Sequence, residues 1–326
     1  MAVAKVCGIE TEYGIHVAGA DMDPVATSSL IVSAYKDSSW GTANFDLSSE
    51  NPTSDARGVN LDDYLDSTID SKMLNTVLTN GARYYVDHAH PEYSSPECRS
   101  VRDAVVYDVA GEHILRKSMK NANARLPEGV EISLFKNNSD GKCNSYGCHE
   151  NYSISRKFNF QKVTESVIPF LITRQIFTGA GKWLSNNKNQ NFQLSQRSDH
   201  MWESISSATT RSRPIINTRD EPHADPEEYR RLHVIVGDSN MSQTTTNLKV
   251  CSTEMILQLI EIGQINDEFN IENPIRTLRD ISSDLTFSKK FRLSNGKEVT
   301  SLNLQEHYLE SVINSSIYSE FEANEY

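Results

Sequence analysis

The chain lacks the hydrophobic segments that direct proteins to or across membranes. Its 326 residues contain no run close to the roughly 18 apolar residues that a membrane-spanning helix needs. The N-terminal sequence MAVAKVCGIETEYGI carries two acidic side chains where a signal peptide has an apolar core. We therefore expect a cytoplasmic protein with no membrane partner.

Cysteine is also scarce. The five cysteines are odd in number and scattered from Cys7 to Cys251, which argues against a disulfide framework. Cys143 and Cys148 are close enough to suggest a zinc pair, but no second pair lies nearby. Reduced thiols are the prediction.

Positive charge is limited overall and concentrated locally. The formal net charge of -12 argues against a nucleic-acid partner, because phosphate backbones demand clustered positive charge. Five arginines form the exception: Arg211, Arg213, Arg219, Arg230 and Arg231. They are either a solvated surface cluster or a site for an anionic partner.

Three common motifs are missing. The sequence has no GxxxxGK[ST] and no GxGxxG, so neither the P-loop nor the Rossmann fold is available for binding a nucleotide. The GxSxG turn of serine hydrolases is absent as well.

A strand with two carboxylates is the strongest local signal. Residues 3–15 alternate in a period of two, which puts Glu10 and Glu12 on the same face. Like charges on a half-buried face are costly unless a cation or a shared proton relieves them, and carboxylate oxygens suit Mg²⁺. The alternative is that one glutamate faces solvent at a sheet edge.

A second strand is predicted over residues 82–90 (ARYYVDHAH), ending before Pro91 and placing Tyr85 and Asp87 on one face. A carboxylate at Asp87 can serve as nucleophile, general base or metal ligand. Surface-loop side chains are the alternative for this cluster, which also contains His88, His90, Glu92 and Glu97.

Histidines follow in two more clusters, one formed by His149, Glu150 and Asn151 and the other by His233 and Asp238. A lone histidine is more often a structural residue than a ligand. Together with the acidic strands and the arginines, however, these clusters match what magnesium–nucleotide chemistry requires.

The remaining patterns indicate an α+β fold with helices against a mixed sheet. Residues 37–70 are rich in Ser, Asp and Asn and predict a long mobile loop. Ser252 is placed to cap a helix that Gly263 ends. Residues 304–321 form an amphipathic helix whose apolar stripe, from Tyr308 onward, needs a covering partner.

Six motifs between residues 8 and 240 resemble, in order, those of the enzymes that attach or remove the prokaryotic ubiquitin-like protein Pup. They are GIETEYG, NGARYYVDHAHPEYSSPEC, KNNSDGKCNSYGCHENY, FQLSQRSDH, NTRDEPHAD and RRLHVIVGDSN. The resemblance implies a glutamine-synthetase-like catalytic domain over residues 1–326, in which an antiparallel sheet packed with helices forms a cradle for ATP and Mg²⁺. It also implies Pup and pupylated proteins as partners in the Pup–proteasome pathway, and we expect a monomer.

The resemblance also implies roles for individual residues. The magnesium-site positions match Glu10, Tyr85, Glu92, His149 and His233, to which we add Glu12 because it shares a strand face with Glu10. The nucleotide-contacting positions match Arg83, Ser94, Ser95 and Asn151, to which we add Arg219 from the arginine group. Asp87 matches the catalytic aspartate.

Two activities are compatible with this resemblance. A depupylase hydrolyses the isopeptide bond between the Pup C-terminal glutamate and a substrate lysine, and deamidates a C-terminal glutamine. Asp87 then attacks the carbonyl or activates a water, while ATP and Mg²⁺ organise the site. A Pup ligase first phosphorylates the Pup glutamate with ATP, and Asp87 helps to deprotonate the incoming lysine.

The two parts of the chain favour different activities. Residues 1–130 resemble the depupylase branch, including the segment SENPTSDARG, whereas the sequence from Cys143 onward resembles the ligase. Because the loop and the Asp87 strand are expected to line the reacting bond, depupylase is our leading hypothesis and Pup ligase the alternative.

The family members continue well beyond the position of Tyr326 and add a small C-terminal domain. We therefore expect a chain truncated within the catalytic domain, or a divergent form. This expectation adds a third hypothesis from another class, an inactive Pup-binding fragment.

Overall fold

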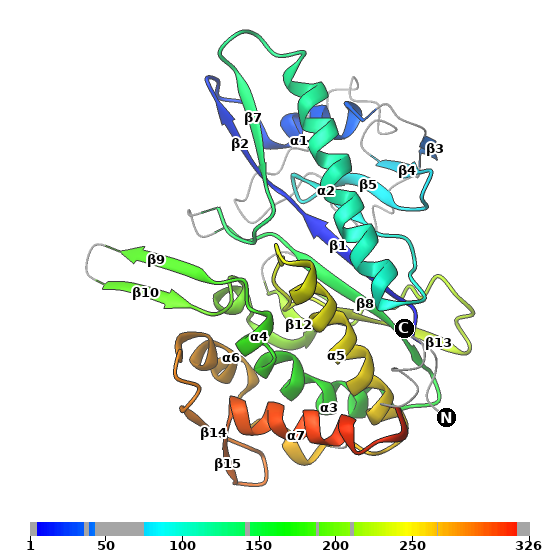
Figure 1. Ribbon diagram of the computed structural model, residues 1–326, viewed down its shortest axis with the longest axis vertical. Helices are drawn as coiled ribbons and strands as arrows, with labels where there is room; N and C mark the ends of the chain where they lie inside the picture. Colours follow the sequence, from blue (N-terminus) through cyan, green and yellow to red (C-terminus); the bar gives the residue numbers. More distant parts are fainter. Residues whose placement is uncertain are drawn as a thin grey trace. The chain divides into compact units, whose positions relative to one another are not determined.

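The computed structural model describes residues 5–35, 39–42, 75–140, 144–186, 189–208, 212–265 and 267–317 (Figure 1). The chain forms two compact units. The N-terminal unit contains Gly8–Cys98 and Asp103–Cys148, and the C-terminal unit contains Met1–Cys7, Arg99–Arg102 and His149–Tyr326. The single catalytic domain expected from the sequence stays a prediction. Among the described residues, no helix combines the length and apolarity needed to cross a bilayer.

The N-terminal unit is an antiparallel sheet packed with two helices. Its elements are β1 (Cys7–Glu12), β2 (Gly14–Ala18), α1 (Pro24–Ser33), β3 (Ser39–Thr42), β4 (Asn75–Leu78), β5 (Arg83–Asp87), β6 (His90–Ser94), α2 (Val101–Asn123) and β7 (Glu131–Phe135). The strand order is β1-β6-β5-β4-β3, and β2 pairs separately with β7. The strands predicted at the GIETEYG and RYYVD motifs are thus separated only by β6.

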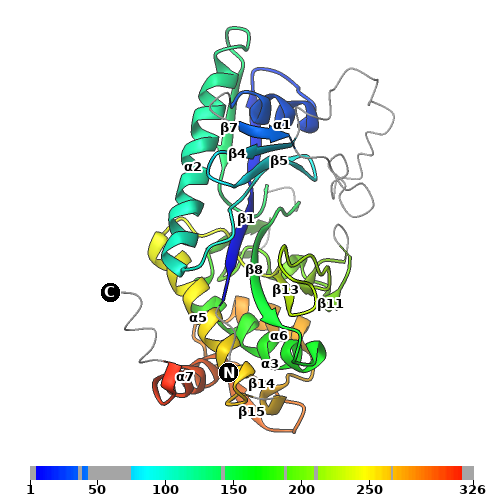
Figure 2. The ribbon, with the colours of Figure 1, turned by 90° about the vertical axis from the view of Figure 1, so that its right-hand side faces the viewer.

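One face of this sheet is apolar. Tyr84, Val86 and Tyr93 point to it from β5 and β6, and each is at most 2% exposed. Ile31 of α1 and Leu115 of α2 belong to the same core cluster, and Figure 2 shows α2 running alongside β4, β5 and β7. Because side chains alternate along a strand, burying this face commits the intervening residues to the opposite face.

The prediction of one strand over residues 82–90 is wrong at its end. Strand β5 stops at Asp87, and β6 begins at His90, so Pro91 lies inside a strand. Between them His88 and Ala89 turn the chain with φ values of 45° and 65°. Proline has no N–H to donate to a neighbouring strand. Pro91 instead takes part through its carbonyl, which accepts the N–H of Tyr13 at 3.0 Å.

The segment predicted as a loop over residues 37–70 contains a short strand at its start. Strand β3 pairs with β4 in antiparallel register, with an irregularity between Ser39 and Gly41. Four residues were too few for the sequence to show alternation. The rest of the predicted loop lies outside the described residues.

The C-terminal unit combines a four-strand sheet order, β11-β12-β13-β8, with several helices. Its strands are β8 (Cys148–Ser155), β9 (Lys182–Asn186), β10 (Asn189–Gln193), β11 (Glu203–Ser206), β12 (Pro214–Asn217), β13 (Tyr229–Val234), β14 (Lys290–Arg292) and β15 (Glu298–Thr300). Its helices are α3 (Phe160–Thr173), α4 (Gln175–Thr178), η3 (Ser198–His200), α5 (Gln243–Glu261), η4 (Asp267–Phe269), α6 (Pro274–Ser283) and α7 (Ser301–Ile313). The β11–β12 pair is parallel, so the sheet is mixed.

Helix α5 starts earlier than predicted. It begins at Gln243 and not near Ser252, whose hydroxyl donates to the Leu248 carbonyl within the helix. The first turns are rich in threonine and lack an apolar stripe, but Thr246, Lys249 and Val250 are buried, so packing extends the helix. Its predicted end is confirmed, because Gly263 follows with a φ of 75°.

The apolar stripe of the last helix is only partly buried. Tyr308 and Val312 of α7 are buried, and the Tyr308 ring packs edge-on against Phe170 with centroids 5.3 Å apart. Leu309 and Ile313, which the sequence placed on the same stripe, are 59% and 52% exposed. The helix ends at Ile313, earlier than predicted, and residues 318–321 of the predicted helix lie outside the described residues.

Gly111 of α2 allows the close packing of that helix against the sheet. A Cβ atom at this position would lie 2.5 Å from Cδ1 of Tyr93. In a free helix Gly→Ala stabilises by about 1 kcal/mol. We expect Gly111→Ala to destabilise the protein by about 1–2 kcal/mol instead, because overpacking outweighs propensity.

Urea denaturation of the purified chain measures this difference. Val106→Ala on the same helix is the control, because Val106 is 55% exposed and its truncation should change the free energy of unfolding by less than about 0.5 kcal/mol. A Gly111→Ala protein more stable than wild type would contradict the close packing.

Candidate active site

The predicted site residues of the N-terminal unit gather on the polar face of its sheet. They form two rows across β1, β6 and β5: Glu12, Glu92 and Tyr85 in the first, and Glu10, Ser94 and Arg83 in the second. Both rows share a face because alternate residues of a strand point to the same side. Residues that the sequence placed on two separate strands are therefore neighbours.

Glu92 is the most buried of these carboxylates, with 1% of its surface exposed. Its Oε1 accepts the Tyr85 hydroxyl at 2.7 Å, while within the described part of the chain Oε2 has no hydrogen-bond partner. Burial, reinforced by the charges of Asp87, Glu10 and Glu12, raises the pKa of Glu92 well above its ordinary value. An ionised Glu92 at neutral pH thus needs a compensating cation.

Tyr85 and Arg83 support this carboxylate from β5. Burial, and then the nearby charge of Glu92, raise the pKa of Tyr85 well above its usual range, so the phenol stays protonated and donates to Glu92. The Arg83 guanidinium lies 3.8 Å from the centre of the Tyr85 ring, and its Nε donates to Asn75 Oδ1 at 2.9 Å. Direct metal ligation by Tyr85 stays a prediction.

Asp87 closes β5 at the edge of this group. Its Oδ2 lies 2.6 Å from Nδ1 of His88, the first residue of the left-handed turn. His90, at the other end of the turn, places its Nδ1 3.8 Å from Oε2 of Glu12. The turn therefore brings two imidazoles next to the carboxylates. The sequence showed only that these residues are close along the chain.

The two predicted nucleotide-contacting serines differ in their surroundings. The Ser94 hydroxyl lies on the polar face, 3.3 Å from Glu92 Oε1 and 3.4 Å from the Tyr85 oxygen. The Ser95 hydroxyl accepts the Ile9 N–H at 3.0 Å and donates to the Pro96 carbonyl at 3.1 Å. Ser95 thus joins β1 to the end of β6, and a nucleotide contact through it stays a prediction.

The polar face fits a hard divalent cation. It offers several carboxylates, and one of their buried oxygens, Oε2 of Glu92, has no hydrogen-bond partner among the described residues. Carboxylate oxygens are the ligands that Mg²⁺ prefers. Within this unit, Glu10, Glu12 and Glu92 are the residues that would hold the ion. Arg83 supplies positive charge beside them.

In the C-terminal unit, the predicted residues of β8 and β13 lie side by side. His233 pairs in register with Asn151, and Asn217 of β12 continues this row. His233 Nδ1 lies 2.7 Å from Asn151 Oδ1, and because an amide oxygen only accepts, this contact favours a proton on Nδ1. A second-sphere bond of this kind is what a metal-binding histidine uses to fix its tautomer.

His149 lies next to His233, with ring centroids 5.2 Å apart. The predicted magnesium ligands are therefore divided, four on the polar face of the N-terminal unit and two imidazoles adjacent in the C-terminal unit. Asn217, which is only 2% exposed, was not predicted as a site residue. Its place at the head of the NTRDEPHAD motif was the available signal.

The arginine group of the sequence is largely paired with acids. Arg230 Nε donates to Asp220 Oδ2 at 3.0 Å, and Arg219 and Arg231 each lie 3.6 Å from a carboxylate oxygen of Glu221. Arg211 lies outside the described residues. A nucleotide contact by Arg219 stays a prediction.

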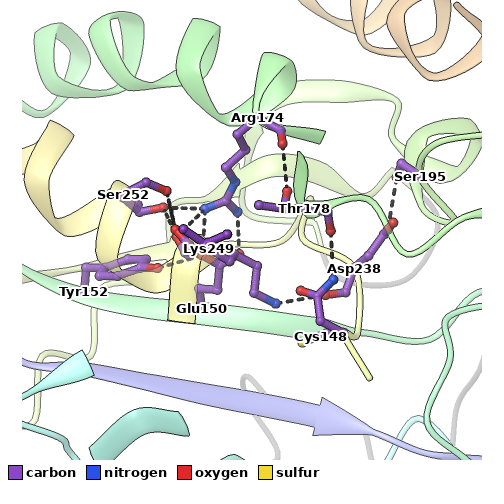
Figure 3. Close-up of polar contacts among 12 residues, drawn as sticks. Cys148, Glu150, Tyr152, Arg174, Thr178, Ser195, Asp238, Lys249 and Ser252 are labelled. Atoms are coloured by element: carbon purple, nitrogen blue, oxygen red, sulfur yellow. Dashed lines mark hydrogen bonds and ion pairs between the residues drawn. The ribbon is translucent and has the colours of Figure 1, made fainter. Parts of the chain in front are cut away.

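A buried ion pair on the reverse side of β8 was missed by sequence analysis. Glu150 lies between His149 and Asn151 and points into the protein, where both of its oxygens accept hydrogen bonds from Arg174 (Figure 3). Tyr152 donates to the same carboxylate at 2.7 Å. Both charged residues are at most 1% exposed.

Electrostatics favour the charged form of this pair. Burial by itself would raise the pKa of Glu150, but the Arg174 and Lys249 charges outweigh it and the pKa is lowered. Alternation then directs His149 and Asn151 to the opposite face of β8. The ion pair therefore fixes which way the predicted site residues of this strand face.

Asp238 anchors a loop network beside this pair. Lys249 Nζ donates to the Asp238 carbonyl at 2.8 Å, and the Asp238 side chain accepts the Ser195 hydroxyl at 3.0 Å (Figure 3). The backbone N–H groups of Ala180 and Gln196 donate to the same carboxylate, each at 2.9 Å. Asp238 is therefore a structural residue, not a partner of His233 as its position in RLHVIVGD suggested.

The buried carboxylate of Glu92 leads to a prediction about the binding of divalent cations. We expect Mg²⁺ to raise the melting temperature of the wild-type chain, since a cation bound at about a hundred times its Kd adds about 2.7 kcal/mol. Glu92→Gln should lose most of this shift. With EDTA present, Glu92→Gln should be at least as stable as wild type at pH values above 4.5, the ordinary pKa of glutamate. The folded-state pKa of Glu92 is raised, so ionising this carboxyl as the pH rises lowers the free energy of unfolding of the wild type.

Differential scanning fluorimetry with MgCl₂ or EDTA across pH 4 to 8 provides the measurement. Glu131→Gln removes an exposed carboxylate of the same unit and should leave the Mg²⁺ response unchanged. Equal Mg²⁺ shifts in wild type and Glu92→Gln would show that Glu92 is not part of a cation site.

Arg174 generates a prediction about stability. Arg174→Met leaves the buried Glu150 without its cation and should cost about 3–5 kcal/mol in urea denaturation. The double variant Arg174→Met/Glu150→Gln should regain most of that loss because no uncompensated charge remains.

The exposed pair Arg276–Asp280, 3.7 Å apart, provides the matched control. Arg276→Met should change the free energy of unfolding by less than about 1 kcal/mol, as is typical of surface ion pairs. A single Arg174→Met variant as stable as its control would contradict the role given to the buried pair.

Known proteins share this architecture. The chain superposes on the crystal structure of the ligase PafA in complex with the prokaryotic ubiquitin-like protein Pup with a TM-score of 0.76 and 34% identity, over 95% of this chain and 57% of that one. A structure of the Pup ligase PafA in complex with ADP gives a TM-score of 0.67 and 43% identity over 73% of this chain and 53% of that one. These likenesses confirm the α+β fold.

Sequence comparison gives relatives of two kinds. A depupylase of Acidothermus cellulolyticus is 47% identical over 317 residues, covering 94% of this chain and 63% of the relative. A Pup–protein ligase of Kineococcus radiotolerans is 56% identical over 240 residues, covering 72% of this chain and 53% of the relative. The chain thus spans between half and two thirds of the length of these relatives.

The family model described as Pup-ligase protein matches residues 5–323, nearly the whole chain of 326 residues. This match confirms the resemblance found from the six motifs. The chain belongs to the Pup-ligase protein family, whose relatives here include both Pup ligases and a depupylase.

Proposed function

We propose that this chain carries the active site of an ATP- and Mg²⁺-dependent depupylase that hydrolyses the isopeptide bond between the Pup C-terminal glutamate and a substrate lysine. Asp87 carries this proposal. It ends β5 on the polar sheet face, beside the buried carboxylate Glu92, and its Oδ2 is held by His88. A carboxylate fixed at the edge of a cation site is suited to attack a carbonyl or to activate a water.

The comparisons support the proposal in two ways. The depupylase relative aligns over 94% of the chain, more than the 72% covered by the ligase of Kineococcus radiotolerans. The solved PafA structures contain Pup in one case and ADP in the other, which supports Pup and an adenine nucleotide as ligands of this chain.

In this proposal, the residues of the chain would have the following roles. Glu10, Glu12 and Glu92 hold the cation, and Tyr85 orients Glu92 through its hydroxyl. Arg83 balances negative charge at the same face. Bound Mg²⁺ and ATP would supply positive charge and a polyanionic surface that position the Pup glutamate. Asp87 would then attack the carbonyl carbon or activate a water that does, and the C–N bond to the lysine breaks while the leaving nitrogen takes a proton from water. After direct attack, a water hydrolyses the resulting anhydride, which releases the Pup glutamate and regenerates Asp87.

Pup–protein ligation is the second candidate, and sequence identity favours it. The ligase relatives reach 56% and 55% identity over their aligned regions, above the 47% of the depupylase. The same carboxylate face would serve a ligase, with Asp87 accepting a proton from the incoming lysine ammonium. Cytoplasmic location and a monomeric state stay predictions under either activity.

Turnover of a pupylated protein with ATP and Mg²⁺ tests the function. We expect wild type to release Pup, and Asp87→Asn to lower the rate by about 10²- to 10⁴-fold while leaving the Mg²⁺-induced thermal shift in place. Asp21→Asn, an exposed aspartate of the same unit, should retain the wild-type rate.

A second reaction distinguishes the candidates. Incubation with ATP, an acceptor protein and Pup ending in glutamate should give no conjugate if the chain is a depupylase. Conjugate formation coupled to ADP release would select the ligase. Binding of Pup without either reaction would overturn both activities and favour a Pup-binding module.

A further inference from the structure

We propose that Glu12, Asp87 and His88 form a second metal site, selective for a transition-metal ion such as Zn²⁺, whose occupation blocks Asp87. Each residue offers one ligand atom, and these atoms lie within 4.8 Å of one another. All three belong to the N-terminal unit. The site uses His88, which positions Asp87 in the chemistry described above but is not one of the residues that would hold Mg²⁺.

The short turn between β5 and β6 creates this grouping. His88 and Ala89 both take left-handed backbone conformations, so the chain reverses within two residues and His90 opens the next strand. The Ala89 carbonyl accepts the hydroxyl of Ser28 in α1 at 2.7 Å, which ties the turn to a helix. His88 is therefore held beside Asp87 before any ligand binds.

The candidate ligand atoms are close enough for one ion to reach all of them. His88 Nδ1 lies 2.6 Å from Asp87 Oδ2, and His90 Nδ1 lies 3.8 Å from Glu12 Oε2. Zn²⁺ binds imidazole nitrogen and carboxylate oxygen at about 2.0–2.2 Å, so tetrahedral ligand atoms lie about 3.4 Å apart. A bound ion would therefore replace the direct contact between Asp87 and His88 and draw in the Glu12 oxygen, which lies within 4.8 Å of both ligand atoms. His90 is a neighbouring fourth group.

Ligand chemistry separates this site from the one for Mg²⁺. Mg²⁺ takes oxygen ligands and retains water, whereas mixed imidazole and carboxylate ligands favour Zn²⁺ and other late first-row metals. The surroundings are also anionic and partly dry, because Glu92, the cross-strand partner of Glu12, is buried with its Oε2 lacking a partner among the described residues. The electrostatic attraction between a divalent cation and these carboxylates is therefore stronger than it would be at the protein surface.

The consequence for activity rests on the proposed function. An ion bound to Asp87 occupies the lone pairs needed to attack a carbonyl, activate a water or accept a lysine proton. Because Glu12 would serve either metal, Zn²⁺ would also compete with Mg²⁺. The geometry points to a metal-inhibited enzyme in which submillimolar Zn²⁺ stops turnover despite excess Mg²⁺.

Direct binding tests the site without reference to turnover. We expect calorimetry of the full chain in excess MgCl₂ to show one Zn²⁺ site that His88→Asn weakens by about tenfold or more. Asparagine is the chosen replacement because it tolerates the left-handed φ of 45°. His16→Asn, which removes an exposed histidine of the same unit, should bind Zn²⁺ like wild type.

X-ray absorption at the zinc edge of the wild-type complex gives a readout that depends on no variant. At least one imidazole with carboxylate oxygens is expected, and an all-oxygen shell would overturn the site. So would equal affinity in His88→Asn and His16→Asn. If Zn²⁺ binds through His88 but no reaction on Pup is found, the metal site stands and the proposed function fails.

Discussion

The carboxylates on one face of the N-terminal sheet impose the constraint on which the site depends. The opposite face carries Tyr84, Val86 and Tyr93 in the core, and alternation therefore gathers Glu12, Glu92 and their neighbours on the other side. Burial of Glu92 makes its negative charge costly. The negative charge of Glu92 therefore has to be removed by a proton or compensated by a cation, and a cation bound there would also place positive charge next to Asp87.

The C-terminal unit orients its site residues by a different interaction. On β8, Glu150 is buried and bound by Arg174, so its neighbours His149 and Asn151 must face the other way. His233 then meets Asn151 in register from β13. A buried ion pair is weak support for stability compared with an apolar pair, but it specifies orientation well because a shifted register would leave both charges unpaired.

Local patterns in the sequence were enough to predict several of the strands and which of their residues share a face. The period of two in GIETEYG put Glu10 and Glu12 on one face, and that pairing is confirmed by the register with β6. The break after Asp87 was misplaced because the left-handed turn at His88 has no glycine to mark it. The start of α5 was missed because its first turns, although buried by packing, have no apolar stripe in the sequence.

Long-range partners could not be predicted. Arg174 follows an apolar helix, and only the folded chain brings it to Glu150, 24 residues away in sequence.

Binding of a catalytic cation by the polar face is the interaction on which the proposed chemistry depends. Anomalous diffraction from crystals of the chain grown with MnCl₂ and a non-hydrolysable ATP analogue tests it most directly. We expect a manganese peak coordinated by Glu92, whereas a fully occupied peak elsewhere with Glu92 unliganded would show that this face is not the cation site.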